Sequence, residues 1–243
     1  FGLIGQNGAG KSTTFNILLN RILKTSGDVT VNNMKFDGSS PYNPFADSVF
    51  DYNNVAACFQ GNALWEDMSV AANLNFYASL NNVNKEALNQ LILYFDFDFY
   101  LYKKVNELST GNQRKLCIII SLLINPSMAF FDEATCGVDL IIRIKLKHLF
   151  DELRVKNNCI AIFTTHFLKD VELFCNKLGI IKEGNFLCID SIDAIKKNLG
   201  GYIVNFTKNE NSDIDRMHNE MRKFGASSRG FKDDMKNTES LII

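Results

Sequence analysis

The chain has 243 residues, of which 46% are hydrophobic and 22% are charged, and phenylalanine alone occurs 20 times. This composition is typical of a globular protein with ample core material and excludes a disordered chain, and the length allows one large domain with or without a small appendage. A formal net charge of −1 excludes the broad basic surface that many nucleic-acid-binding proteins use, so no nucleic-acid partner is expected.

The first 23 residues carry the pattern around which the rest of the chain is interpreted. The apolar run 1–4 predicts a buried strand, and a glycine-rich loop and then a helical pattern follow it. Residues 5–12 fit G-x-x-x-x-G-K-[ST], the phosphate-binding loop. The residues predicted to bind the nucleotide are those of the loop and its neighbour: Gly5, Gln6, Asn7, Gly8, Ala9, Gly10, Lys11, Ser12 and Thr13.

The spacing of this loop suits phosphate binding. Its glycines let successive backbone N–H groups point at phosphate oxygens, and the helix beginning near Lys11 directs its positive end at the same anion. Lys11 would reach the β- and γ-phosphates, and the Ser12 hydroxyl would hold Mg²⁺. A chance match is the alternative, but a strand before the loop and a helix after it favour a site for a nucleoside triphosphate with Mg²⁺.

Farther along the chain, apolar periodicity predicts strands that alternate with helices. The expected strands cover residues 28–32, 34–37, 55–59, 128–131, 159–165, 178–181 and 186–189. The expected helices cover residues 69–80, 85–95, 140–156 and 167–176, and a further helix has Ser109 as its N-cap, contains the apolar run 116–124 and ends before Pro126. The stretch 39–52 contains two of the three prolines and predicts an irregular surface segment. This alternation predicts an α/β fold with a mostly parallel core sheet.

Two further features of the composition carry expectations. The tract between the helix at 85–95 and Tyr102 is rich in Phe and Tyr, which favours the core of a small helical subdomain at about 66–126 over a partner-docking surface. The six cysteines are scattered with no C-x-x-C pair, so we expect reduced core thiols in a cytosolic compartment and no zinc site.

The pattern changes at residue 200. Residues 202–206 alternate as a strand does, residues 213–224 allow a helix, and residues 227–238 predict a loose end. We therefore expect a main domain at 1–199 and a small α+β accessory module at 200–243. The chain begins inside a strand, which leads us to expect a fragment of a longer polypeptide.

Several polar features fall at expected strand ends or helix starts: the phosphate loop, Gln60, Ser109, the pair Asp132 and Glu133, and His166. Ligands of an open parallel sheet bind beyond the carboxyl ends of its strands. We therefore expect these features to form one nucleotide site.

The acidic pair and the histidine have distinct expected roles. Asp132 can ligate Mg²⁺ directly or through water, and Glu133 can then orient or deprotonate the attacking water. His166 could donate to the γ-phosphate and hold Glu133 in place. The alternatives are that the acidic pair only caps a helix and that His166 only packs in the core. We interpret the other two histidines, His148 and His218, as core residues of this kind.

In order and spacing these motifs resemble the ATP-binding cassette (ABC) ATPases over about residues 1–190, which implies a P-loop NTPase fold with a helical signature subdomain. The segment LSTGN at 108–112 stands where that family has L-S-G-G-Q, its most specific motif. The segments NALWEDMSV at 62–70, GNQRKL at 111–116 and LGGYIVNF at 199–206 are similar to the A subfamily of ABC transporters, many of which move lipids.

The resemblance implies a mechanism and partners. Two cassettes, in one chain or two, would pair head to tail around two ATP molecules and power transport through transmembrane domains at the cytosolic face of a membrane. Gln60 would sense Mg²⁺ and the water and signal to those domains, and Asp139 would lie at the seam between the cassettes. The signature residues would face the partner's ATP: Ser109, Thr110, Gly111 and Asn112.

Departures from the family pattern keep other functions open. Thr110 replaces the first signature glycine, Ala134 replaces the proline after the glutamate, and Leu140 replaces the proline after Asp139. One alternative is a cassette that binds ATP but hydrolyses it weakly because of Thr110. Another is a soluble ABC ATPase that acts on nucleic acid or ribosomes, which would share every catalytic marker.

Overall fold

The computed structural model describes residues 1–31, 34–36, 54–199, 203–207 and 238–242. The expected irregular segment at 39–52 and the expected helix at 213–224 lie outside this part. The chain forms two compact units, Phe1–Ile192 and Asp193–Ile243, and each is described by itself.

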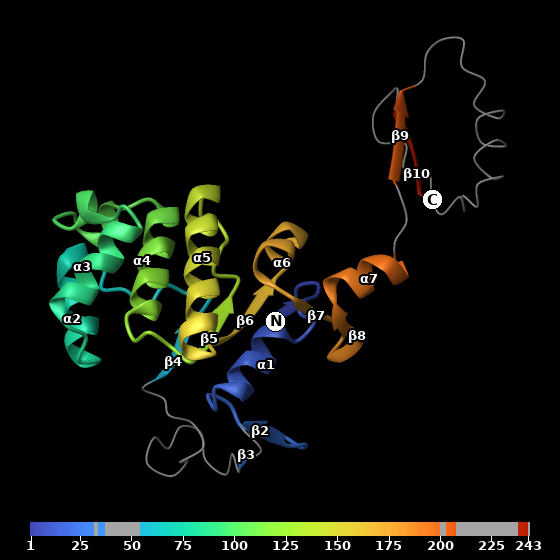
Figure 1. The fold of residues 1–243 in the computed structure, drawn as a ribbon, viewed down its shortest axis with the longest axis horizontal. Coiled ribbons are helices and arrows are strands. Elements are labelled where there is room, and N and C mark those ends of the chain that lie inside the picture. Colours follow the sequence, from blue (N-terminus) through green and yellow to red (C-terminus); the bar gives the residue numbers. More distant parts are fainter. Residues whose placement is uncertain (32–33, 37–53, 200–202, 208–237, 243) are drawn as a thin grey trace. The chain divides into compact units, whose positions relative to one another are not determined.

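The centre of the first unit is a six-stranded sheet in the order β4-β5-β6-β1-β7-β8 (Figure 1). The strands β4, β5, β6, β1 and β7 pair in parallel, and only β8 runs antiparallel to its neighbour. This arrangement confirms the predicted α/β class with a mostly parallel core. The six strands are β1 (Gly2–Ile4), β4 (Val55–Cys58), β5 (Met128–Asp132), β6 (Ile160–Thr165), β7 (Lys177–Lys182) and β8 (Asn185–Ser191).

Helices cover both faces of the sheet because neighbouring strand residues point to opposite sides. Phe130 of β5 meets Phe15 of α1 (Lys11–Leu18) edge to face, with ring centroids 5.5 Å apart. The next residue, Phe131, meets Phe150 of α5 (Leu140–Asn157) at 5.1 Å. These two contacts place α1 and α5 on opposite faces. The helix α6 (Leu168–Phe174) follows β6.

A helical region lies between β4 and β5 in the sequence. It contains α2 (Val70–Leu80), α3 (Lys85–Tyr94), two short 3-10 turns (Asp98–Tyr100 and Val105–Glu107) and α4 (Thr110–Leu122). Side-chain oxygens of Ser69, Asn84 and Ser109 each accept a backbone N–H and so cap α2, α3 and α4. The predicted N-cap at Ser109 is thereby confirmed.

The aromatic tract after α3 divides between core and surface. Phe95 and Phe97 are fully buried, as the prediction of a helical core requires. Phe99 and Tyr102 are 82% and 95% exposed, so the core interpretation is wrong for them. Side chains three residues apart share a face of a 3-10 turn, so the turn at Asp98–Tyr100 fits the common exposure of Phe99 and Tyr102.

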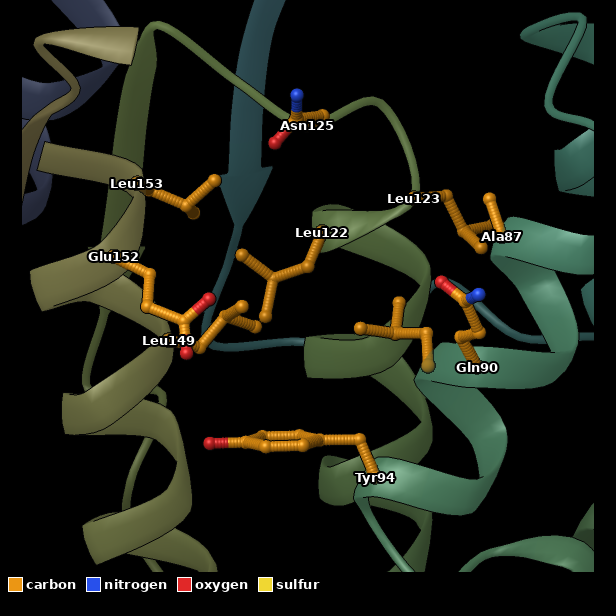
Figure 2. Close-up of a pocket in the computed structure, with 10 residues that line it drawn as sticks. Ala87, Gln90, Tyr94, Leu122, Leu123, Asn125, Leu149, Glu152 and Leu153 are labelled. Carbon is orange, nitrogen blue, oxygen red and sulfur yellow. The ribbon is translucent and has the colours of Figure 1, made fainter. Parts of the chain in front are cut away.

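A hollow of about 380 Å³ lies between α3, α4 and α5. Figure 2 shows that side chains from these three helices and from the turn after α4 surround it. At one end Tyr94 spans the gap, and its hydroxyl donates to the Lys145 carbonyl at 2.8 Å. The lining is mainly aliphatic: Ala87, Leu91, Leu122, Leu123, Leu149 and Leu153, with Gln90, Tyr94, Asn125 and Glu152.

Smaller elements complete the described residues. The two expected strands, β2 (Val29–Val31) and β3 (Met34–Phe36), are present and pair antiparallel with each other. In the second unit, β9 (Ile203–Thr207) pairs antiparallel with β10 (Thr238–Ile242). The strand predicted at 202–206 is therefore confirmed, but residue 238 belongs to a strand rather than to a loose end. The helix α7 (Ile192–Leu199) was not anticipated.

The six cysteines are free thiols, but they do not share one environment. Cys58, Cys159 and Cys175 are buried, and Cys117 and Cys188 are partly buried. Cys136 is exposed in the turn between β5 and α5, so the prediction of a core thiol is wrong there. In the described part of the chain, none of the helices combines the length and apolar character that a membrane span requires.

Candidate functional site

The phosphate loop joins β1 to α1 and folds around its own lysine. Gly10 caps α1 with a φ of +106°, a left-handed conformation that a side chain would strain. Lys11 is only 6% exposed, and its Nζ donates to the carbonyls of Gly5 at 2.8 Å and Gln6 at 3.1 Å. The loop therefore holds the positively charged ammonium of Lys11 beside the first turn of α1.

A polar cavity of about 340 Å³ opens over this loop. It brings together the phosphate loop, the adjacent Thr13, the glutamine that follows β4 and the glutamate that follows β5. Its lining residues are Asn7, Gly8, Gly10, Lys11, Ser12, Thr13, Gln60 and Glu133.

Three of the predicted nucleotide-binding residues do not line this cavity. The side chain of Ala9 packs with Leu3 and Ile181 in the core. A Cβ on Gly5 would come within 2.4 Å of the Ile181 carbonyl, so Gly5 permits close packing against β7. Gln6 contributes its carbonyl to Lys11 rather than its side chain to the cavity.

The two adjacent carboxylates face different surroundings. Asp132 is 5% exposed, and its Oδ1 accepts a hydrogen bond from the Thr164 hydroxyl behind the cavity. Glu133 has a left-handed backbone with a φ of +48°, held by its N–H, which lies 3.1 Å from both the Thr164 carbonyl and hydroxyl oxygens. This turn at the end of β5 directs Glu133 into the cavity while Asp132 stays buried.

Glu133 is flanked by two basic groups. Its Oε1 lies 4.0 Å from Lys11 Nζ and 3.2 Å from His166 Nδ1. The register of β5 and β6 sets Asp132 opposite Thr164, so the residues that follow both strands meet at the same edge. The structure thus brings the loop, Gln60, Glu133 and His166 together, as the sequence led us to expect.

Arg114 of α4 is a residue of this region that the sequence analysis did not single out. The residue is 5% exposed, and its guanidinium donates to backbone carbonyls at the ends of β4 and β5. The distances are 3.3 Å to Gln60, 2.8 Å to Asp132 and 3.0 Å to Ala134, and Phe59 also accepts. Spacing offered a signal, because Arg114 shares a helix face with the buried Ile118 and Ser121.

The signature residues lie at the start of α4 and not in this cavity. The Ser109 hydroxyl caps the helix by accepting from the Asn112 N–H at 3.3 Å, and Thr110 is exposed. A Cβ on Gly111 would come within 2.6 Å of the Gly137 carbonyl, so α4 packs closely on the loop after Glu133. Asp139, at the end of that loop, is exposed and caps α5 through the Ile142 N–H at 3.0 Å.

The donors around the cavity suit a hard cation that keeps phosphate and water ligands. In the described residues there is no group of three or more His, Cys, Asp or Glu side chains that could hold a metal ion. Ser12 and Gln60 line the cavity, and Asp132 is buried outside its lining. Mg²⁺ characteristically uses one or two protein oxygens together with substrate phosphates, which this donor set fits.

Comparison with known proteins agrees with this architecture. The family model described as ABC transporter matches residues 1–136. The human cholesterol transporter ABCA5 is 32% identical over 91% of this chain and 14% of its own length. ABC transporter A family member 6 of Dictyostelium discoideum is 30% identical over 84% of this chain and 12% of its own length. The chain thus spans a small part of these relatives.

Two solved structures have the same fold. One, an ATP-binding subunit of an ABC transporter, matches with a TM-score of 0.68 and 20% identity over 91% of this chain and 87% of its own. Another, a dimer of the ATP-binding cassette MJ0796 in a post-hydrolysis state bound to ADP and Pi, matches with a TM-score of 0.65 and 19% identity over 79% of this chain and 84% of its own. The P-loop NTPase fold is thereby confirmed, and the chain is an ATP-binding cassette of the ABC transporter family whose relatives belong to the A subfamily.

Proposed function

We propose that this cassette binds Mg-ATP over the phosphate loop and hydrolyses it, with Glu133 polarising the attacking water. The observation that carries the proposal is the position of the Glu133 carboxylate. It faces the polar cavity, 4.0 Å from Lys11 Nζ and 3.2 Å from His166 Nδ1. A carboxylate held at the edge of a phosphate site by two basic groups is placed to orient a water and receive its proton.

The loop side of the cavity would bind the phosphates. Loop N–H groups and the N-terminus of α1 attract the anion, and Lys11 would exchange its two carbonyl partners for β- and γ-phosphate oxygens. Ser12 and Gln60 would hold Mg²⁺, which neutralises phosphate charge, and the buried Asp132 would reach that ion through a water.

His166 would hold Glu133 in place and donate a hydrogen bond to the γ-phosphate of ATP. With a proton on Nδ1, the imidazole donates to the glutamate and fixes its orientation. The ring also lies against Phe167, with centroids 4.0 Å apart, which restricts its rotation. Orientation of the base by a second group is a common arrangement in hydrolytic sites.

Pairing with a second cassette would complete the ATP site. The exposed start of α4 would present Thr110 and the positive end of the helix to the phosphates of an ATP bound by the partner. The dimeric form named for the cassette MJ0796 supports such pairing. The partner would be another cassette in the same polypeptide or a separate one.

The work of the cycle would be transport across a membrane. The names of the relatives as A family ABC transporters, and as a cholesterol transporter for ABCA5, support transmembrane domains as partners and a lipid-like substrate. Closure around ATP and opening after hydrolysis would be passed to those domains, with Gln60 reporting the state of the site. This cassette would then lie at the cytosolic face of the membrane.

Steady-state ATP turnover with Mg²⁺ tests the proposal. Glu133→Gln is expected to lower kcat by about 10²-fold or more while nucleotide binding is retained. Lys11→Ala is expected to lose both. Glu86→Gln, at an exposed position on α3, is the matched control and should behave as wild type. A Glu133→Gln protein with the wild-type rate would contradict the role assigned to Glu133.

A further inference from the structure

Outside the lining of the cavity, a buried carboxylate connects three segments that follow the motifs of the site. Asp170 of α6 is 4% exposed. Its Oδ2 accepts from the Thr135 hydroxyl at 2.6 Å, and its Oδ1 accepts from Arg143 Nη1 at 2.6 Å. The Thr165 hydroxyl is 3.5 Å from the same Oδ2. We name these four residues the Asp170 cluster.

The members of the Asp170 cluster are neighbours of residues assigned to ATP hydrolysis and pairing. Thr135 lies two residues after Glu133, and Thr165 immediately precedes His166. The Thr165 hydroxyl also accepts from the Phe167 N–H at 2.9 Å, which fixes the turn that carries His166. The cluster therefore holds both chain segments that meet at the Glu133–His166 pair.

Arg143 extends the Asp170 cluster to the expected seam between cassettes. Arg143 of α5 uses its Nε to donate to the Val138 carbonyl at 2.9 Å, next to Asp139. Its Nη1 holds Asp170, so one guanidinium fastens the loop 135–139 to α6. An ionic hydrogen bond of this kind is stronger than a neutral one.

The burial of Asp170 makes this network costly to break. Removing a donor from a carboxylate that is almost fully buried costs far more free energy than the loss of an exposed hydrogen bond, because water does not replace the donor. A displacement of the loop 135–139 would therefore draw Asp170 and Thr165 with it rather than break the network. The geometry links the exposed Asp139 to the turn that carries His166.

We propose that Asp170 is a positioning residue that couples the loop at Asp139 to the Glu133–His166 pair, so that contact with a second cassette at the seam sets the alignment of the hydrolytic groups. This proposal rests on the proposed ATP hydrolysis. Asp170 does not line the nucleotide cavity and acts only through Thr135, Thr165 and Arg143.

A matched pair of substitutions isolates the link to the loop. Thr135→Val removes the hydroxyl at nearly constant volume and leaves the ion pair of Asp170 with Arg143 in place, so the protein is expected to fold. It should lower kcat for ATP by about tenfold while KM stays within about twofold. Thr135→Ser keeps the hydroxyl and is expected to restore most of the rate. Equal rates for the valine and serine variants would overturn the proposal.

A double-mutant cycle separates positioning from a purely structural role. If Thr135 acts through His166, Thr135→Val should lower kcat by less than about twofold when His166→Ala is already present. Thermal unfolding of the same proteins measures stability separately. A loss from Thr135→Val that multiplies fully with the loss from His166→Ala would show that the cluster does not act through the histidine.

Hydrogen exchange of the nucleotide-free protein gives a second readout that needs no turnover. Thr135→Val should raise amide exchange in both 135–139 and 165–168, and leave 7–13 unchanged. Faster exchange in 135–139 alone would overturn the coupling. A wild-type protein that binds Mg-ATP without hydrolysing it would contradict the proposed hydrolysis instead, and the exchange pattern would still decide whether the two segments are coupled.

Discussion

His166 Nδ1 lies 3.2 Å from Glu133 Oε1, where the parallel strands β5 and β6 end side by side. Because this contact orients the proposed base, His166→Ala is expected to lower kcat by about 10²-fold and to change ATP affinity little. His148→Ala is the matched control, because the structure places His148 at an exposed position on α5, where its interpretation as a core histidine is wrong; His218 lies outside the described residues. Single-turnover hydrolysis measures the effect, and a rate for His166→Ala equal to that of the control would contradict it.

Arg114 is expected to contribute mainly to the stability of the fold and less to the rate of hydrolysis. Arg114→Met leaves buried backbone carbonyls at the ends of β4 and β5 without their donor, including those of Asp132 and Ala134. Since hydrogen bonds to charged groups contribute about 1.5–3 kcal/mol each, we expect the free energy of unfolding to fall by about 3 kcal/mol or more.

Urea unfolding measures this loss for Arg114→Met. Arg154→Met replaces an exposed arginine in the last turn of α5 and should change stability by less than about 0.5 kcal/mol. Arg114→Lys keeps one cation but not the planar set of donors, so its stability should fall between wild type and Arg114→Met. Equal stability of Arg114→Met and Arg154→Met would show that the carbonyls do not depend on this side chain.

Thr110 tests whether the altered signature weakens the ATP site of a partner. The residue is exposed in the first turn of α4, so Thr110→Gly would relieve crowding near the phosphates of a partner's ATP and should cost at most about 1 kcal/mol of helix stability. We expect tighter ATP-dependent pairing and faster turnover. Thr110→Ser, which keeps the hydroxyl, should be intermediate. Turnover unchanged by the glycine would rule out weak hydrolysis caused by Thr110.

The cysteines should differ in reactivity with N-ethylmaleimide. Burial raises the pKa of the Cys58 thiol to about 12, and the pKa values of the Cys159 and Cys175 thiols to about 11. The thiolate is the reactive form, so these raised values leave very little of it near pH 7.5. The exposed Cys136 should therefore be labelled first.

The pH dependence of labelling follows from the same pKa values. As pH rises toward 9, the thiolate fraction of Cys58 should grow about tenfold per unit, because its pKa of about 12 is still far above the solution pH. Peptide mass spectrometry at several pH values follows each site. Labelling of Cys58 at pH 7.5 as fast as that of Cys136 would contradict the burial that the structure shows.

The sequence allowed the main site to be predicted because its motifs are local. A phosphate loop needs only a strand, its glycines and a helix, and Glu133 and His166 each follow directly after an apolar strand of the same parallel sheet. The carboxyl ends of parallel strands share one edge, so their convergence followed from the strand pattern alone. The contact of Glu133 with His166 is of this kind.

Features that depend on distant backbone could not be predicted in the same way. Arg114 donates to the carbonyls of Phe59 and Gln60, which precede it by 55 and 54 positions, and to those of Asp132 and Ala134, which follow it by 18 and 20 positions. No pattern of side chains in the sequence encodes these partners. The Asp170 cluster likewise joins residues up to 35 positions apart. The exposure of Phe99 and Tyr102 depends on a short 3-10 turn, and composition alone did not reveal it.

The most direct test of the account is the effect of Mg-ATP on the mass of Glu133→Gln in solution, measured by light scattering. Hydrolysis is blocked in this variant, so the closed state should accumulate, and two cassettes should pair around bound nucleotide. We predict that the mass rises from 27.5 kDa toward twice that value with Mg-ATP and stays at 27.5 kDa with ADP. A protein that binds Mg-ATP and remains at 27.5 kDa at high concentration would contradict pairing of this cassette with its own copy.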